Sequence, residues 1–236
     1  MGDDIALFPL DETGIAQGSC LSPLIANIYL SNFDRLMNQK GIKCFRYIDD
    51  LLLIGPKSKN LKKAFESGKL YLKTLGLDVY DPFAENKKAD IGNVDSGFDF
   101  LGCRIYPGLI QPSQQNRQKF LKRLKQIVSD SKKELNQISS KDISIKLGFI
   151  KTLDSLNNAV LGWGHAFSFC NDFQIMRHLD SEIENITSEY LQFVFHKLDE
   201  NSHMLSKILG LHNIQRIANE KREKDLKAKE KVNSGC

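Results

Sequence analysis

Apolar residues recur along the first part of the chain with two periods, one helical and one extended. After Ser22 they are spaced by three and four residues, as on a helix with one buried face: Leu24, Ile25, Ile28, Tyr29, Phe33, Leu36 and Met37. Ser22 can cap this helix, Pro23 suits its first turn and Gly41 can end it. The short apolar runs 44–47 and 51–54 then predict a β-hairpin.

A second helix is predicted between residues 61 and 75, where apolar positions again follow one another by three and four. Ser58 before it and Gly76 after it are typical start and stop signals. Residues 77–80 predict a strand, because apolar residues dominate this short run. The order of helix, hairpin, helix and strand fits part of a split βαβ unit.

The remaining chain changes from strands to helices. Residues 98–106 predict a strand pair interrupted at Gly102, and Pro112 marks a joint. Every later pattern is helical, with apolar stripes at 117–133, 143–161 and 172–198. We therefore expect an α+β fold in which a mixed first region is followed by an all-helical second region.

Composition limits the class of protein. With 236 residues, 41% of them hydrophobic, the chain can bury a sizeable core in one or two domains. No apolar run approaches the roughly 20 residues that span a bilayer, and no secretory signal is visible. The five cysteines and five histidines are scattered without a metal-type spacing. A soluble, cytoplasmic protein with reduced thiols and no membrane partner is the expectation.

Two adjacent carboxylates, Asp49 and Asp50, lie between the two runs of the predicted hairpin. An unpaired carboxylate is too costly to bury, so both should meet solvent or a cation. Mg²⁺ is a suitable cation because it takes carboxylate oxygens and leaves positions open for phosphates. Alone, the pair could be only a solvated turn, since aspartate favours turns.

Three motifs, in this order, resemble those of reverse transcriptases. Residues 14–23 are similar to the family's G-x-P-Q-G-S-x-L-S-P loop, 45–50 to its F-x-Y-x-D-D turn and 98–102 to its F-x-F-L-G primer hairpin. Residues 156–167 and 179–183 resemble a maturase pattern, although glycine, tryptophan and aliphatic residues at helical spacing can equally be core. The likeness is to bacterial enzymes of the group II intron and retron-like kind. It implies a partial right-hand polymerase palm with a split βαβ, ferredoxin-like fold, followed by a helical thumb or maturase-like region.

The resemblance implies a metal site at the hairpin. Asp49 would ligate two Mg²⁺ ions, or Mn²⁺ in their place, and Asp50 would support the site from alongside. Tyr47 would pack against the primer end or the template strand, a role compatible with that of a half-buried strand residue. Gly102 would let the second hairpin approach the primer backbone.

The resemblance also implies contacts to the incoming deoxynucleoside triphosphate. Gln17, Gly18 and Ser19 would line the nascent base pair, where glycine avoids a collision and glutamine offers a donor and an acceptor. Lys87 or Lys88 would protonate the leaving pyrophosphate. Plain solvated lysines are an equally good interpretation of that pair.

A basic helix follows the primer hairpin. Between residues 117 and 133 a single acid, Asp130, accompanies seven basic residues: Arg117, Lys119, Lys122, Arg123, Lys125, Lys132 and Lys133. Such a face suits a phosphate backbone, and its position matches a polymerase thumb, so Arg117, Lys122 and Lys125 are candidate nucleic-acid contacts. The alternative is a solvated surface helix.

The expected domains are a partial palm over 1–111, a helical thumb or maturase-like region over 112–200 and a charged tail over 201–236. The tail carries mixed charge and is assigned no function.

The chain departs from the family pattern at one position of the glycine loop and in the segments expected before that loop. Ala16 stands where the family usually has proline. The family's first catalytic aspartate lies on a strand before the glycine loop, yet thirteen residues precede Gly14 here, so that strand and the fingers are expected to be missing. Residues 2–4 spell a Gly-Asp-Asp triplet, but it precedes the glycine loop and we interpret it as a coincidence.

The sequence thus predicts an RNA-directed DNA polymerase, truncated or split, that extends a DNA or RNA primer on an RNA template. A partner chain could supply the fingers and the first aspartate. The alternative is a non-catalytic RNA-binding, maturase-like or phage-defence scaffold, which would have no need of paired carboxylates.

Overall fold

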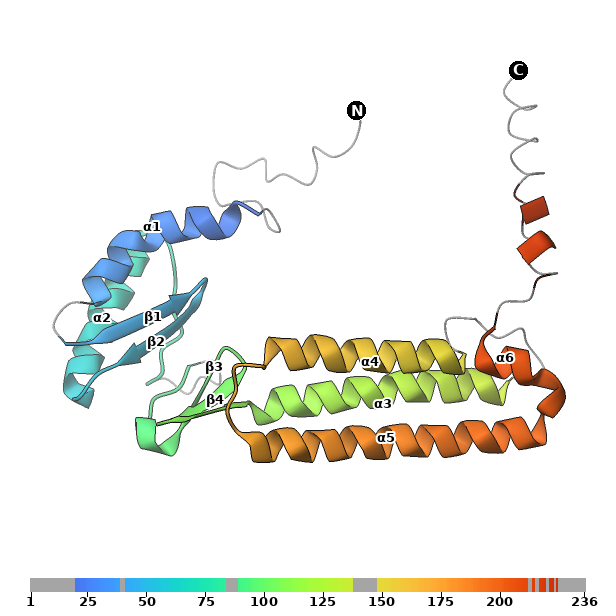
Figure 1. Ribbon diagram of the computed structural model, residues 1–236. Coiled ribbons are helices and arrows are strands. Elements are labelled where there is room, and N and C mark those ends of the chain that lie inside the picture. The colour runs from blue at the N-terminus through green and yellow to red at the C-terminus, as the bar shows by residue number, and fades with distance from the viewer. Residues whose placement is uncertain are drawn as a thin grey trace, which may run out of the picture. The chain divides into compact units, whose positions relative to one another are not determined.

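The computed structural model describes residues 20–38, 41–83, 89–137 and 148–211, with isolated positions between 214 and 224. By their contacts the residues form two compact units, Met1–Asn93 and Val94–Cys236. Each unit is described by itself. The fold mixes helices with two small antiparallel sheets, as the predicted α+β class requires (Figure 1).

The first unit contains α1 (Ser22–Met37), β1 (Lys43–Tyr47), β2 (Asp50–Ile54) and α2 (Ser58–Thr74). The predicted helices and hairpin are all present. The predicted caps are wrong, because Ser22 and Ser58 are already the first helical residues of α1 and α2. In α1 the amide of Ile25 donates to the carbonyl of Leu21 at 3.0 Å, which closes the first turn one residue earlier than predicted.

The core of the first unit lies where α1 and α2 cover one face of the hairpin. Phe33, Met37 and Leu72 are buried there. Gly68 on α2 permits this packing, because a Cβ at that position would come within 2.8 Å of the Met37 sulfur. Residues 77–80 are not a strand. At the end of α2 the Leu77 amide donates a hydrogen bond to the Leu72 carbonyl at 3.0 Å, and Val79 packs on the core without pairing to a described strand.

The second unit begins with a short 3₁₀ turn, η2 (Val94–Ser96), and a three-stranded meander. Its strands are β3 (Phe98–Phe100), β4 (Cys103–Tyr106) and β5 (Leu109–Pro112), in the order β3-β4-β5. The predicted strand pair is confirmed. The third strand, β5, was not predicted, because Pro112 suggested a joint. Pro112 lies opposite Cys103 at the end of this edge strand, where a missing amide hydrogen is tolerated.

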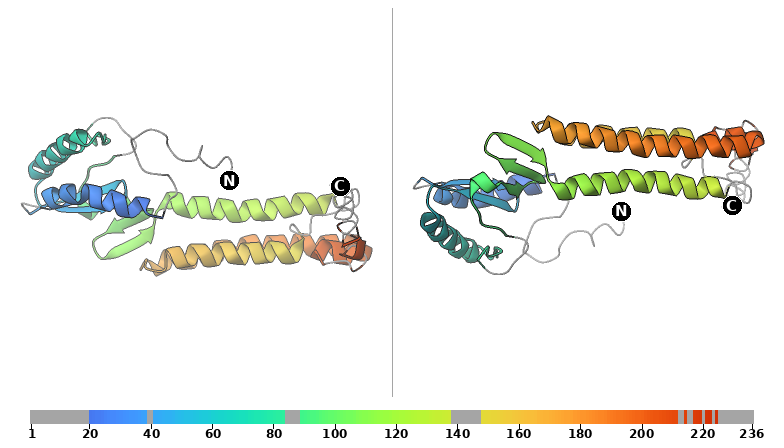
Figure 2. Two further views of the ribbon diagram at one scale, coloured as in Figure 1. Left: turned by 90° about the horizontal axis from the view of Figure 1, so that it is seen from above. Right: turned by 90° about the horizontal axis from the view of Figure 1, so that it is seen from below.

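Three long helices build the body of the second unit: α3 (Gln114–Asn136), α4 (Phe149–Ala166) and α5 (Phe173–Glu200). They run alongside one another, and α3 packs on both of the others (Figures 1 and 2). Asp172 caps α5 by accepting hydrogen bonds from the amides of Gln174 and Ile175 at 3.1 Å. The predicted helices are present, except that residues 143–147 lie outside the described residues.

The core of the second unit is much larger than that of the first. Its buried members are Phe120, Leu124, Val128, Leu135, Leu156, Ala159, Ile186, Tyr190, Val194 and Ile208. Trp163 stacks on Phe120 with ring centroids 4.6 Å apart, so this residue of the maturase-like pattern is part of the packing. Tyr190, which is fully buried, shares a 2.6 Å hydrogen bond with the Ser131 hydroxyl.

The observed units differ in extent from the expected domains. The boundary at 93/94 precedes the predicted one at 111/112, because the β3–β5 sheet groups with the long helices. The amide of Ile110 donates to Asn171 Oδ1 at 2.7 Å, which ties β5 to the segment before α5. Beyond α5 follow η4 (Ser202–Met204) and α6 (Leu205–Leu209), where Ile208 is 1% exposed in the core, although these residues were assigned to the tail. No helix among the described residues has the length and apolar character to cross a membrane.

Candidate metal-binding turn and basic helix face

The turn between β1 and β2 consists of two residues, Ile48 and Asp49, since Tyr47 pairs with Asp50. Ile48 has φ +59°, a left-handed conformation that a β-branched residue rarely adopts. Positive φ at the first central position is the pattern of a type II′ hairpin turn, where glycine is usual. Such strain persists only where the surroundings impose it, and it occurs often at functional sites.

The carboxylates of Asp49 and Asp50 are both exposed at this turn. No ion pair joins either one to a cation of the described residues. Two neighbouring, unpaired carboxylates fit the oxygen ligands that Mg²⁺ or Mn²⁺ takes. Among the residues that the structure describes, however, no group of three His, Cys, Asp or Glu side chains could hold a metal ion, so the turn offers a partial ligand set.

The side chains of β1 alternate between two environments. Cys44 and Arg46 point toward α1 and α2, while Phe45 and Tyr47 lie on the opposite, exposed face. Tyr47 is 59% exposed. The predicted contact residue is therefore exposed beside the two carboxylates, on the hairpin face opposite the one that α1 and α2 cover.

Arg46 was missed by the sequence prediction and is the most highly connected side chain near the turn. Its Nε and Nη2 donate to the two carboxylate oxygens of Asp34 at 2.8 and 2.6 Å. Its Nη1 donates to Asn27 Oδ1 and to the carbonyl of Ile48, both at 3.1 Å. The hydrogen bond to Asp34 raises the pKa of the guanidinium, against the opposing effect of burial.

A signal for this cluster was present in the sequence. Strand alternation places Arg46 on the inward face of β1 together with Cys44, and a charge on that face requires a partner. Asp34 and Asn27 are two turns apart on α1 and so share one side of that helix.

Gly102 lies in the turn between β3 and β4, where Leu101 and Gly102 have φ +49° and +77°. A Cβ on Gly102 would overlap the side-chain amide of Asn116, near the start of α3. That amide donates to the Gly102 carbonyl at 2.9 Å, and the Ser113 amide donates to the same oxygen at 2.9 Å. The glycine thus has a packing role inside its own unit, beside the predicted contact to a primer.

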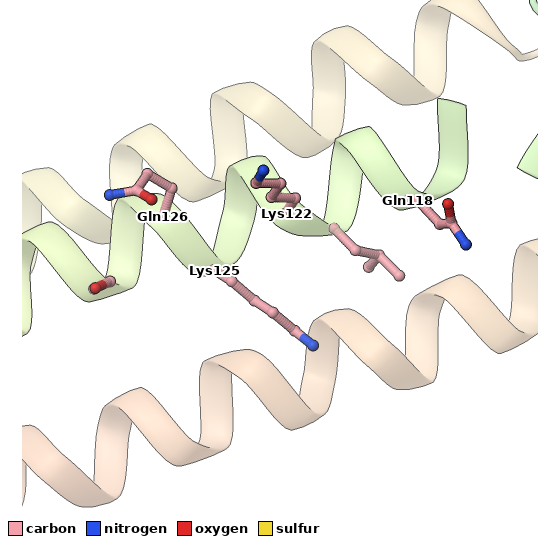
Figure 3. A pocket seen from close by; sticks show the side chains of 6 residues that line it. Gln118, Lys122, Lys125 and Gln126 are labelled. Atoms are coloured by element: carbon pink, nitrogen blue, oxygen red, sulfur yellow. The ribbon is translucent and has the colours of Figure 1, made fainter. Parts of the chain in front are cut away.

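The basic residues of α3 lie mainly on its side away from the core. Lys122 and Lys125 are exposed and line a shallow groove of about 430 Å³ together with Gln118, Leu121, Gln126 and Ser129 (Figure 3). Arg117 is half-buried, and its Nε has no hydrogen-bond partner within the described residues. No acidic side chain lines this groove.

The other half of α3 has a different electrostatic setting. Lys125, Lys132 and Lys133 line a second groove of about 680 Å³, formed with α5, which also contains Glu182 and Glu189. Lys133 further approaches Asp130 at 3.7 Å. Among the described residues, acids thus line the groove of Lys132 and Lys133 and one side of Lys125, whereas Lys122 lines only the groove without an acid.

The structure brings together only part of the predicted site. Asp49, Asp50 and Tyr47 adjoin one another in the first unit, and Gly102 belongs to the second. The basic candidates Arg117, Lys122 and Lys125 lie on α3. The predicted nucleotide contacts Gln17, Gly18, Ser19, Lys87 and Lys88 lie outside the described residues.

Comparison with known proteins gives one positive result. Residues 10–105 match the family model described as reverse transcriptase (RNA-dependent DNA polymerase). No curated protein matches the chain. The matched segment contains the glycine loop, the Asp49–Asp50 turn and β3, and this match supports a reverse-transcriptase-like domain in the first part of the chain.

Proposed function

We propose that this chain is the carboxylate-bearing portion of an RNA-directed DNA polymerase of the group II intron or retron-like kind. The observation that carries the proposal is a strained hairpin turn with two exposed carboxylates, Asp49 and Asp50, that pair with no cation of the described residues and lie within the segment that matches the reverse transcriptase family. Two adjacent negative charges repel each other, and a bound cation would relieve that repulsion.

Asp49 is the principal metal ligand in this proposal, and Asp50 supports it. Bound Mg²⁺ would supply charge neutralisation for the reacting phosphate and activation of the primer hydroxyl. Tyr47, exposed on the same hairpin face, packs against the primer end or the template strand. Gln17, Gly18 and Ser19 hold the nascent base pair, and Lys87 or Lys88 donates a proton to pyrophosphate.

A partner polypeptide that completes the site is part of the proposal. Support comes from the incomplete ligand set of the described residues and from the exposed apolar side of α1. Leu24, Ile25 and Ile28 of α1 and Leu21 directly before it are each at least 46% exposed. Contiguous apolar surface of this kind marks an interaction site in soluble domains. The partner supplies the fingers and the further aspartate.

The first half of α3 serves as the nucleic-acid face. Among the described residues no acid lines the groove that contains Lys122 and Lys125, which favours contact with a phosphate backbone. Lys132 and Lys133 provide an internal control, because they line only the second groove with Glu182 and Glu189, whereas Lys125 lines both grooves. Substitution of the first pair should weaken binding to a primed RNA template more than substitution of the second.

The test is primer extension on an RNA template with Mg²⁺, performed with the chain alone and with the proteins that co-purify with it. We expect weak synthesis alone, synthesis restored by the partner, and loss of that synthesis in Asp49→Asn. The matched control is Asp78→Asn, which removes another exposed carboxylate of the same unit. Robust synthesis by the chain alone that requires Asp49 would contradict the proposed partner.

The scaffold alternative is favoured by one observation, the lack of a third metal ligand among the described residues. It predicts salt-sensitive RNA binding that is equal in wild type and Asp49→Asn, with no synthesis in any combination. That outcome would replace the polymerase proposal.

A further inference from the structure

We propose that Arg46 is a positioning residue, which holds the Asp49–Asp50 turn against α1 through Asp34, Asn27 and the Ile48 carbonyl. This inference rests on the proposed function. Its basis is geometric: one guanidinium joins the strand that enters the turn, the helix behind it and the backbone of the turn itself.

The contacts of Arg46 fix a defined orientation. The planar guanidinium binds Asp34 in a two-pronged arrangement, which sets the direction of the remaining nitrogen, Nη1. Nη1 then reaches the Ile48 carbonyl at 3.1 Å, immediately before Asp49. The Arg46 side chain is only 7% exposed, so solvent cannot readily replace these contacts.

The same arrangement explains how Ile48 adopts its unfavourable conformation. A positive φ at a β-branched residue must be imposed by the surroundings. The hydrogen bond to the Ile48 carbonyl, anchored to α1 through Asp34, is a suitable restraint. Without it the turn should relax toward conformations in which the two carboxylates point elsewhere.

The charge of Arg46 is paired with Asp34. An arginine next to two catalytic carboxylates would weaken metal binding if it paired with either of them. Here the positive charge is matched by Asp34, at 2.6 Å, and neither Asp49 nor Asp50 forms an ion pair within the part of the chain that the structure describes. Arg46 can therefore restrain the turn without competing with a cation.

The substitution that tests this is Arg46→Lys, which keeps the charge but loses the planar fork. Its matched control is Arg35→Lys, since Arg35 is an exposed arginine on α1 that bonds only to Asn32 Oδ1, at 2.9 Å, within the described residues. A milder variant, Asn27→Ala, removes one Nη1 acceptor from an exposed helical position and should leave the fold intact.

The first measurement is the backbone ¹⁵N order parameter of residues 48–50 in the full chain. We expect values near the rigid level of about 0.85 in wild type and Arg35→Lys, and a fall toward about 0.6 in Arg46→Lys. A smaller fall is expected in Asn27→Ala. Unchanged values in Arg46→Lys would overturn the proposal; if that variant does not fold, unchanged values in Asn27→Ala would do so.

The second measurement is Mn²⁺ binding followed by electron paramagnetic resonance. We expect binding that Asp49→Asn abolishes, that Arg46→Lys weakens about tenfold and that Arg35→Lys leaves unchanged. Asp49-dependent binding that is insensitive to Arg46→Lys would overturn the positioning role. Binding that does not depend on Asp49 would overturn the proposed function instead, and the order parameters would then decide the role of Arg46 by themselves.

Discussion

Substitution of Gly102 by alanine tests whether this glycine serves packing within its unit. Gly102 and Gly108 have nearly equal φ values, +77° and +78°. A Cβ at Gly102 would overlap the Asn116 amide, whereas a Cβ at Gly108 would meet nothing within 4 Å. Gly108→Ala is therefore a matched control that carries the backbone strain without the collision.

The expected magnitudes follow from these two environments. Alanine at a left-handed position costs about 1–2 kcal/mol, of which about 0.4–1 kcal/mol is offset by the loss of unfolded-state entropy. Gly108→Ala should thus destabilise the second unit by about 1 kcal/mol. At Gly102 the Asn116 amide must also swing away from its carbonyl acceptor, and the lost hydrogen bond adds about 1 kcal/mol.

Urea unfolding followed by tryptophan fluorescence measures the difference. Trp163 is the single tryptophan and stacks in the core of the second unit, so its signal reports that unit. With a slope of about 2 kcal/mol/M, the midpoint of Gly102→Ala should lie about 0.5 M below that of Gly108→Ala. In an Asn116→Ala background the difference should vanish, because the hydrogen bond is already absent.

Equal midpoints for the two alanine variants would refute this reasoning. Gly102 would then be free of a packing requirement, and its predicted approach to the primer backbone would remain as the reason for a glycine. Loss of primer extension in Gly102→Ala at unchanged stability would favour that role directly.

Three further predictions concern other parts of the molecule. Tyr190→Phe removes a fully buried hydrogen bond and should lower the unfolding free energy of the second unit by about 1 kcal/mol in the same urea assay; an unchanged midpoint would contradict it. Burial raises the pKa of the Cys170 thiol to about 12, so the rate of its alkylation should be far lower than that of exposed Cys20 and should still rise between pH 7 and pH 10. Mass spectrometry measures both rates, and equal rates at pH 8 would show that Cys170 is accessible. The double substitution of Lys122 and Lys125 by glutamine should reduce the slope of log K against log salt for an RNA–DNA hybrid by up to about 2, as measured by fluorescence anisotropy, and an unchanged slope would remove α3 from the nucleic-acid face.

Local periodicity was sufficient to predict most of the elements. The stripes that predicted α1, α2 and α5 depend on spacings within one segment, and so does the alternation that predicted the β1–β2 hairpin. The buried residues Phe33, Met37 and Leu72 all belong to the predicted stripes. The exact first residue of a helix depends less on the local pattern. Ser22 was therefore predicted as the cap of α1, although it is the first helical residue.

Strand assignments failed where pairing with another segment decides the outcome. Residues 77–80 have the composition of a strand but no described partner, and Val79 packs on the core from a non-strand segment. For β5 the error was the reverse, since a strand was present where none was predicted. Pro112 suggested a break, although the strand pairs with β4 up to that residue. Neither result follows from propensity, since a strand exists only through its partner.

The sequence motif predicted the carboxylates of the site, but the side-chain contacts around them were not predicted. The Asp49–Asp50 turn was identified from its residues and their likeness to a family, and the turn is present. The network of Arg46, Asp34 and Asn27 was not identified, because it joins residues on different elements that no local pattern connects. The inward-facing position of Arg46 on β1 was the one available signal.

Features that violate local rules occur in both units, and those of the first unit lie at the hairpin turn and on α1. Ile48 has a conformation suited to glycine, two carboxylates stand side by side, and α1 exposes Leu24 and Ile28 to solvent. The second unit has such features too, because Leu101 has φ +49° and because Phe173 and Phe195 on α5 are 70% and 61% exposed. Sequences depart from such rules mainly where a ligand or partner compensates, so exposed apolar residues alone single out neither unit. The hairpin differs because its strained residue, Ile48, directly precedes two exposed carboxylates, and this combination supports the proposed metal site at the turn.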